Sequence, residues 1–236
     1  MTEQNLNDIL KDLKKTEEKI NVYIPSLKKE VEFSPLTLSQ QKNIIDKITS
    51  SSFGIIDFYN SLYDVIKTST TVDLNTLNTI DRINIILNFR KNINPIYENI
   101  DVSKVIERNK GVQLPEVKKT IVTDKYTFEV TVPSLVTDFK FNNYIITTYR
   151  DERTLLGKLL VNELSKFVTK FIVNETNTVV DFSNVSIKHK FNFLEAIDSK
   201  YFKQVFEYVN QVRDAEVELV KIDDTQIEIG PELFIM

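Results

Sequence analysis

The chain of 236 residues is 42% hydrophobic and 27% charged and includes 15 Phe and 9 Tyr, which is enough apolar material for a sizeable core and argues against disorder. A formal net charge of −4 argues against a chain that wraps nucleic acid, which normally needs a basic face. The lack of cysteine excludes disulfides and thiolate metal sites and favours a reducing compartment.

The N-terminal segment predicts a helix followed by a β-hairpin. Residues 3–20 carry apolar side chains at helical spacing within an otherwise polar segment, which predicts an amphipathic helix with a narrow apolar stripe. In residues 21–37, two short runs of alternating apolar and polar residues flank a mostly polar turn, and Pro25 marks an edge. This pattern predicts a β-hairpin.

Three helices and a connection are expected next. Thr37 or Ser39 is placed to cap the first of these helices. The other two are expected at residues 54–67 and 78–93, where apolar residues gather on one side. Pro95 ends the last of them, because proline cannot continue a helix. Residues 95–118 are less periodic and predict a connection between two halves of the chain.

The second half combines one clear strand with several helices. Residues 126–132 alternate strictly between apolar and polar side chains, which predicts a strand after a turn at 123–125. Residues 152–173 carry a wide apolar stripe and predict a long helix that is buried on more than one side. The remaining expected elements are a turn at 174–177, a short strand at 179–182, a helix capped by Ser186, a helix at 199–215 and an apolar tail broken at Gly230–Pro231.

These elements together predict an α+β fold that is mostly helical with two small antiparallel sheets or hairpins. The sheets are expected near residues 21–34 and 119–141. We expect an N-terminal half at 1–94, a connection at 95–118 and a C-terminal half at 119–236.

A search for catalytic groups finds few candidates. His189 is the one imidazole, and it lies between Lys188 and Lys190, which disfavour its charged form. The four glycines are scattered, so no glycine-rich loop is available to hold a phosphate. Asp223–Asp224 lacks the spacing of a calcium loop. We therefore expect no catalytic residue, no metal and no cofactor, although a carboxylate-dependent hydrolase stays open.

Location and charge distribution are also constrained. The first residues lack the apolar core of a secretory signal, and no apolar run is long enough to span a membrane, so we expect the cytoplasm. Lysines cluster near the N-terminus (Lys11, Lys14, Lys15 and Lys19) and at Lys188–Lys190. We interpret both clusters as solvated surface rather than as a nucleic-acid site.

Two segments resemble a known family. Val22–Thr37 contains a strand, Pro-Ser-Leu, a second strand and Pro-Leu-Thr, and Gln40-Gln41-Lys42 follows; Gly54–Leu62 is the second segment. Together they resemble the N-terminal part of the baseplate hub proteins of T-even-like contractile-tailed phages, and Phe191–Ile197 is compatible with that family. The resemblance implies a late viral protein without enzymatic activity or cofactor, which acts in the host cytoplasm during assembly as a hub subunit or an assembly factor.

Such a protein would act by docking to other baseplate hub or tail proteins, or to itself. The candidate docking residues lie on the hairpin and at the apolar C-terminal end. They are Tyr23, Phe33, Leu36, Leu233, Phe234 and Ile235. The alternative for each is packing in the core. If the tail docks, alanine at Phe234 and Ile235 should weaken hub association and leave folding nearly intact. The sequence leaves open whether the protein stays in the tail baseplate of the particle or is a transient chaperone.

Overall fold

The computed structural model describes residues 18–49, 53–149, 156–222 and 225–234. Of the described residues, 54% are helical, and the strands form small antiparallel sheets, which confirms the predicted α+β class. The helix predicted at residues 3–20 falls almost entirely outside the described residues, and Ile20 already belongs to a strand.

The described elements follow one another in this order. The α-helices are α2 (Leu38–Thr49), α3 (Ile55–Ser69), α4 (Thr79–Ile93), α5 (Val102–Asn109), α6 (Leu135–Thr148), α7 (Leu156–Phe167), α8 (Ile187–Glu195) and α9 (Lys203–Glu218). The strands are β1 (Ile20–Ile24), β2 (Lys29–Phe33), β3 (Ile96–Tyr97), β4 (Ile100–Asp101), β5 (Lys118–Val122), β6 (Tyr126–Thr131), β7 (Val168–Val173), β8 (Thr178–Asp181), β9 (Lys221–Ile222) and β10 (Thr225–Gln226). Short 3-10 turns η1 (Phe182–Asn184), η2 (Ser199–Phe202) and η3 (Pro231–Phe234) complete the fold.

The predicted hairpin and the helix after it are confirmed. Strands β1 and β2 pair antiparallel, from Ile20 opposite Phe33 to Ile24 opposite Lys29. Thr37 is the residue that caps α2: its hydroxyl accepts a hydrogen bond from the Gln40 amide at 3.2 Å, and the Gln40 side chain accepts one from the Thr37 amide at 2.9 Å. This reciprocal pair satisfies two amide groups at the start of the helix.

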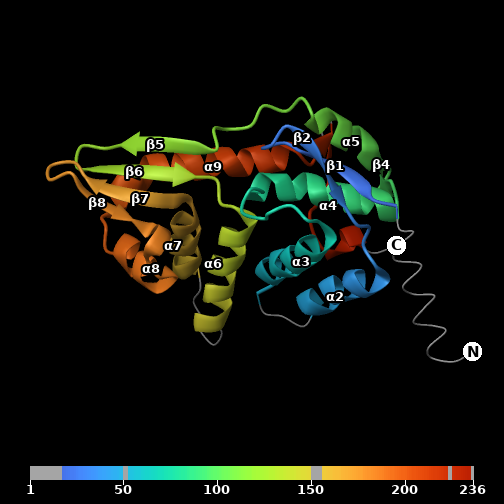
Figure 1. Ribbon diagram of the computed structural model, residues 1–236, viewed down its shortest axis with the longest axis horizontal. Coiled ribbons are helices and arrows are strands. Elements are labelled where there is room, and N and C mark those ends of the chain that lie inside the picture. Colours follow the sequence, from blue (N-terminus) through green and yellow to red (C-terminus); the bar gives the residue numbers. More distant parts are fainter. Residues whose placement is uncertain (1–17, 50–52, 150–155, 223–224, 235–236) are drawn as a thin grey trace, which may run out of the picture.

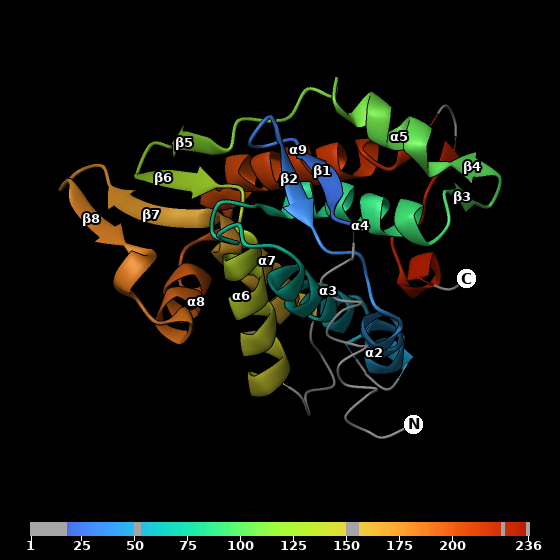
Figure 2. The ribbon, with the colours of Figure 1, turned by 45° about the vertical axis from the view of Figure 1, so that its right-hand side comes forward.

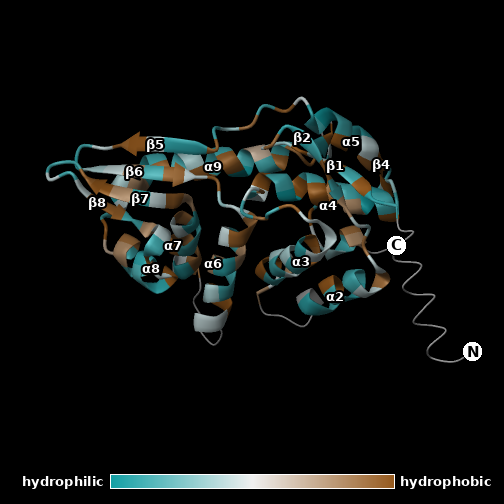
Figure 3. Cartoon of the chain, in the orientation of Figure 1, coloured by the Kyte–Doolittle hydropathy of each residue, from teal (hydrophilic) through white to brown (hydrophobic). Residues whose placement is uncertain are grey.

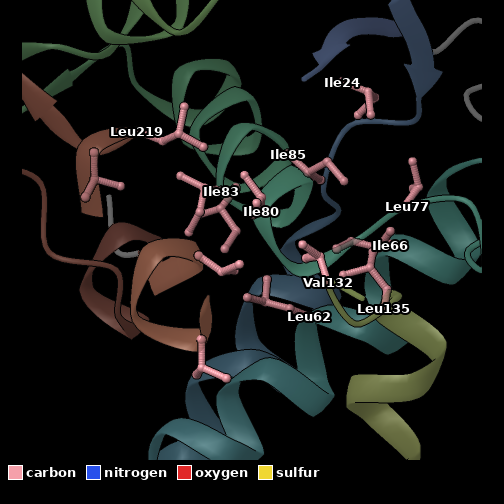
Figure 4. Packing of buried hydrophobic residues seen from close by; sticks show 14 of the residues in the cluster. Ile24, Leu62, Ile66, Leu77, Ile80, Ile83, Ile85, Val132, Leu135 and Leu219 are labelled. Carbon is pink, nitrogen blue, oxygen red and sulfur yellow. The ribbon is translucent and has the colours of Figure 1, made fainter. Parts of the chain in front are cut away.

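Helix α4 forms the centre of the molecule. Every residue from Thr79 to Arg90 is buried, as expected for a helix that packs on all sides. Its start is fixed by a capping box between Asn78 and Asp81, and Asp81 also accepts hydrogen bonds from the amide and hydroxyl of Ser26 at 2.9 and 2.5 Å. Apolar side chains from β1, α3 and α6, and Leu219 just after α9, pack with those of α4 (Figure 4).

A four-stranded antiparallel sheet, in the order β5-β6-β7-β8, occupies one end of the molecule, and the β1–β2 hairpin lies toward the other (Figure 1). Helix α9 runs from the sheet to α4 and contacts it; both views agree on this arrangement (Figures 1 and 2). One hydrophobic cluster includes Phe128 of the sheet and Val22 of the hairpin. The core is therefore continuous, and the division into two halves stays a prediction.

Two of the predicted element boundaries are wrong. The helix predicted over 152–173 ends at Phe167, and Val168–Val173 forms β7, in which Phe171 pairs with Phe128 of β6. The β-branched and aromatic residues of this stretch favour a strand once a partner strand is available. The sheet was expected to run to residue 141, but β6 ends at Thr131 and the next strand of the sheet is β7, because Ser134 caps α6 by accepting a hydrogen bond from the Thr137 amide at 3.1 Å.

The predicted connection at 95–118 holds more structure than its weak periodicity indicated. It contains the two-residue hairpin β3–β4 and helix α5, whose start is capped by the Asp101 side chain. Within the described part of the chain, no helix combines the length and apolar character needed to cross a membrane, and Figure 3 shows polar residues along each labelled helix.

Candidate docking site

A cleft of about 460 Å³ opens between α3, α6, α7 and α9. Three large apolar side chains with high exposure form its rim. Ile55 at the start of α3 is 50% exposed, and Leu156 and Leu160 on α7 are 85% and 52% exposed. Leu156 and Leu160 are four residues apart and so lie on one face of α7. The rim therefore presents apolar surface on two facing elements.

The floor of the cleft is a buried cluster of charges. The Asp138 carboxylate lies 2.6 Å from Nη1 of Arg82 and 2.7 Å from Nζ of Lys166, and Lys166 also lies 3.1 Å from Glu163. Burial alone would raise the pKa of Asp138, but the charges of Lys166 and Arg82 outweigh it and lower the pKa to about 2. The Arg82 guanidinium also lies 3.6 Å from the centre of the Tyr59 ring. The cluster is thus ionised and internally compensated.

Within the described residues, three buried polar atoms of the floor have no hydrogen-bond partner. They are Nε of Arg82, Oδ1 of Asn142 and Oδ1 of Asn162. Leaving such an atom unpaired costs about 1–3 kcal/mol, so buried polar groups are normally satisfied. An amide or peptide group both donates and accepts hydrogen bonds. The three atoms are closed to solvent, so a ligand that carries such groups pairs them only where the floor of the cleft opens.

Glu216 is a further acid of the cleft. Burial raises the pKa of Glu216, and the charge of Arg82 offsets this only in part. Its carboxyl therefore holds a proton at higher pH than an exposed glutamate does. Among the described residues, no group of three or more His, Cys, Asp or Glu side chains is placed to hold a metal ion.

The docking residues predicted from the sequence do not line this cleft. Phe33, Leu233 and Phe234 are buried in the chain's own core, and Tyr23 and Leu36 are half-buried. Ile235 lies outside the described residues. For the three buried side chains, the core-packing alternative holds.

The C-terminal residues are held by specific contacts. The Phe234 ring lies 6.1 Å from the Phe58 ring, and Arg90 donates a hydrogen bond to the Leu233 carbonyl at 3.3 Å. Alanine at Phe234 would therefore remove core packing, which corrects the expectation that it leaves folding nearly intact.

Sequence reasoning missed the rim. The apolar stripe that contains Leu156 and Leu160 predicts a helix buried on more than one side, and the stripe that contains Ile55 predicts an apolar face. The structure leaves all three side chains exposed. The Lys188–Lys190 cluster was interpreted as solvated, and Lys188 and His189 are exposed, with His189 Nδ1 2.7 Å from the Ser186 hydroxyl. Lys190, however, is buried. No family model, no curated protein and no solved structure matches the chain.

Proposed function

We propose that this chain is a structural or assembly component of the central hub of a phage tail baseplate and acts by docking to other hub or tail proteins. The observation that carries the docking role is the cleft. Its exposed apolar rim surrounds a floor in which three buried polar atoms have no partner among the described residues. The resemblance of residues 22–62 to hub proteins supplies the biological setting. It rests on packing and turn residues.

The cleft is suited to a segment of polypeptide. Apolar side chains of a partner would pack among Ile55, Leu156 and Leu160, where burial is the main source of binding energy. Where docking opens the floor, peptide or amide groups of the same segment would pair with Asn142 and Asn162, which removes the penalty of leaving them unpaired. The charged floor is already compensated within the chain, so it neither attracts nor repels the partner strongly.

The test is co-purification from infected or co-expressing cells with a variant that carries Leu156→Asp and Leu160→Asp. Both side chains are exposed, so the variant should fold with a change in stability under about 1 kcal/mol. We expect it to recover at least tenfold less of the hub partners, because two charges would be buried at the contact. Leu38→Asp is the matched control, since Leu38 is 70% exposed but lies outside the cleft.

Equal recovery of the same partners by the rim variant and the wild type would refute the docking role of the cleft. A transient chaperone is the alternative within the same proposal. Mass spectrometry of purified particles separates the two, because a resident subunit is retained in the tail baseplate and a chaperone is left in the host cytoplasm. Light scattering of the purified chain tests self-association.

A carboxylate-dependent hydrolase is a second candidate, because Asp138, Glu163 and Glu216 all line the cleft. Hydrolysis by two carboxyl groups needs one acid with a raised pKa and one carboxylate free to act as base or nucleophile. Glu216 meets the first requirement. Asp138 and Glu163 are held by cations, which is why we favour docking. Cleavage of chromogenic glycosides by the wild type, lost in Glu216→Gln, would favour the hydrolase.

A further inference from the structure

A second and larger depression, a groove of about 1020 Å³, crosses the polar face of the four-stranded sheet. Its floor is a row of cross-strand neighbours, one from each strand. The row is Thr120, Glu129, Lys170 and Asp181. The walls come from the turn of the β1–β2 hairpin and from the first turns of α6 and α8. The groove therefore joins segments that are far apart in the sequence.

The groove is basic although the whole chain is acidic. Six lysines but only two carboxylates line it. Both carboxylates are engaged: Glu129 lies 3.1 Å from Lys170, and Asp181 accepts a hydrogen bond from the Ser183 amide at 2.8 Å. Lys118 and Lys140 are exposed and have no ion pair within the described part of the chain. The groove therefore has a net positive potential, which attracts anions.

Lys190 is the decisive residue of the groove. The residue is only 7% exposed, and its ammonium lies 5.1 Å from the Phe141 ring centre and 5.2 Å from the Phe182 ring centre. Within the described residues, no carboxylate or carbonyl pairs with this ammonium. Burial lowers the pKa of Lys190 to about 8. Attraction to two aromatic rings offsets part of the cost of burying the charge, but a ring is a weaker partner than a carboxylate.

A structural explanation accounts for some of these lysines but not for Lys190. Lysines on an edge strand such as β5 discourage pairing with other chains, and this suffices for Lys118. Lys190 lies on α8 rather than on a strand edge, and a methionine would fill the same space without the cost of burying a charge. We propose that the groove binds an acidic segment of a partner polypeptide, with one of its carboxylates seated against Lys190 between Phe141 and Phe182.

The shape and chemistry of the groove favour a polypeptide over other anions. The groove is far larger than a single inorganic ion, and Leu27, Val185 and Ile187 give it apolar walls that suit side chains next to a carboxylate. A nucleic-acid strand would be held by many phosphate contacts and by exposed aromatic platforms. Phe141 and Phe182 are each only 6% exposed, so neither ring forms such a platform. This inference rests on the proposed docking function in that it names the chemistry of a partner.

The test uses a fluorescein-labelled peptide of repeating Glu and Ala, with fluorescence anisotropy measured at low ionic strength. The wild type should bind this peptide and not its Gln–Ala counterpart. Lys190→Met should weaken binding at least about tenfold, since a charge-assisted contact in a buried site is lost. Lys188→Met removes the same charge from an exposed position of the same helix and should weaken binding less than about twofold. A thermal melt establishes that each variant is folded.

Several results would overturn the inference. They are a wild type that does not bind the Glu–Ala peptide, equal binding of the Gln–Ala peptide, and equal losses in Lys188→Met and Lys190→Met. Tighter binding of a single-stranded oligo-dT, lost in Lys190→Met, would overturn it in favour of nucleic acid. Should Lys190→Met not fold, Lys140→Gln must weaken peptide binding and the NMR-measured pKa of Lys190 must rise when peptide is added. A negative result for the groove does not affect the experiment on Leu156 and Leu160, because those residues form the rim of the separate cleft.

Discussion

Lys166 and Lys190 are buried to the same extent, with 8% and 7% of each residue exposed, yet their pKa values move in opposite directions. Burial alone would lower both. Beside Lys166, however, the carboxylates of Asp138 and Glu163 outweigh burial and raise its pKa. No carboxylate of the described residues compensates Lys190, and its pKa falls to about 8. The direction of the pKa shift of a buried cation therefore depends on its ionic partner and not on its burial alone.

The two lysines also border the same groove, which makes the contrast informative about function. Lys166 is neutralised by its own chain and belongs to the architecture that separates the groove from the cleft, since it lines both. Lys190 lines the groove and has no carboxylate beside it among the described residues. A chain selected only for stability would have little reason to retain it.

Removing the partner of Lys166 should have the largest effect on stability. Asp138→Asn leaves Arg82 and Lys166 buried without their shared carboxylate, and we expect a loss of about 3–5 kcal/mol in the free energy of unfolding at pH 7. Chemical denaturation measures it. The folded-state pKa of Asp138, about 2, lies below the unfolded value near 3.8. Its contribution is therefore complete above pH 4–5 and is lost as the pH falls toward 2.

The matched control for this prediction is Asp64→Asn. Asp64 pairs with Lys47 at 3.3 Å, but half of its side chain is exposed. Solvent screens such a pair, so its removal should change stability by less than about 1 kcal/mol. Equal losses in the two variants would mean that the buried cluster stabilises the fold no more than an exposed ion pair does. The contrast between Lys166 and Lys190 would then be refuted.

Removing the charge of Lys190 should have an intermediate effect of the opposite sign. Lys190→Met should raise the free energy of unfolding at pH 7 by about 1–3 kcal/mol, because the uncompensated ammonium is no longer buried. The folded protein gives up this proton near pH 8 and the unfolded chain near pH 10.5. The advantage of the variant is therefore complete below pH 8 and shrinks as the pH rises toward 10.5.

Denaturation of both proteins across this pH range measures the difference directly, and other titrating groups cancel between them. A difference in stability that stays constant from pH 7 to pH 10.5 would contradict the assignment, since it would reflect packing of the methionine rather than the charge. A variant less stable than the wild type at pH 7 would show that Lys190 has a partner.

Much of the fold follows from local patterns. The hairpin at 20–33, the helices α3 and α4 and the strand β6 were predictable because their periodicity, caps and turns all agree. Residues 152–173 were harder, because leucine and phenylalanine at spacings of three and four are compatible with a helix throughout. The switch to a strand at Val168 depends on β6 being available as a partner, which is a tertiary effect.

The candidate sites were less accessible from the sequence than the fold. Lys188 and Lys190 are identical residues two positions apart, and only the packing of Phe141 and Phe182 buries one of them. Likewise, apolar residues at helical spacing indicate which face of α7 is apolar but not that Leu156 and Leu160 extend beyond the core. Exposure is a property of the assembled fold, so local spacing cannot supply it.

The smallest expected effect tests how much Asp138 and Glu163 each contribute to stabilising the charge of Lys166. Glu163 contacts Lys166 at 3.1 Å, but 27% of its side chain is exposed, whereas Asp138 is buried. Glu163→Gln should therefore lower the free energy of unfolding by about 1 kcal/mol, well below the loss in Asp138→Asn. Glu195→Gln is the control, because Glu195 forms a more exposed pair with Lys158 at 3.1 Å. If Glu163→Gln lowers the free energy of unfolding as much as Asp138→Asn does, both carboxylates are needed to stabilise one buried ammonium. The free-energy cost of burying Lys190 without a carboxylate is then correspondingly larger.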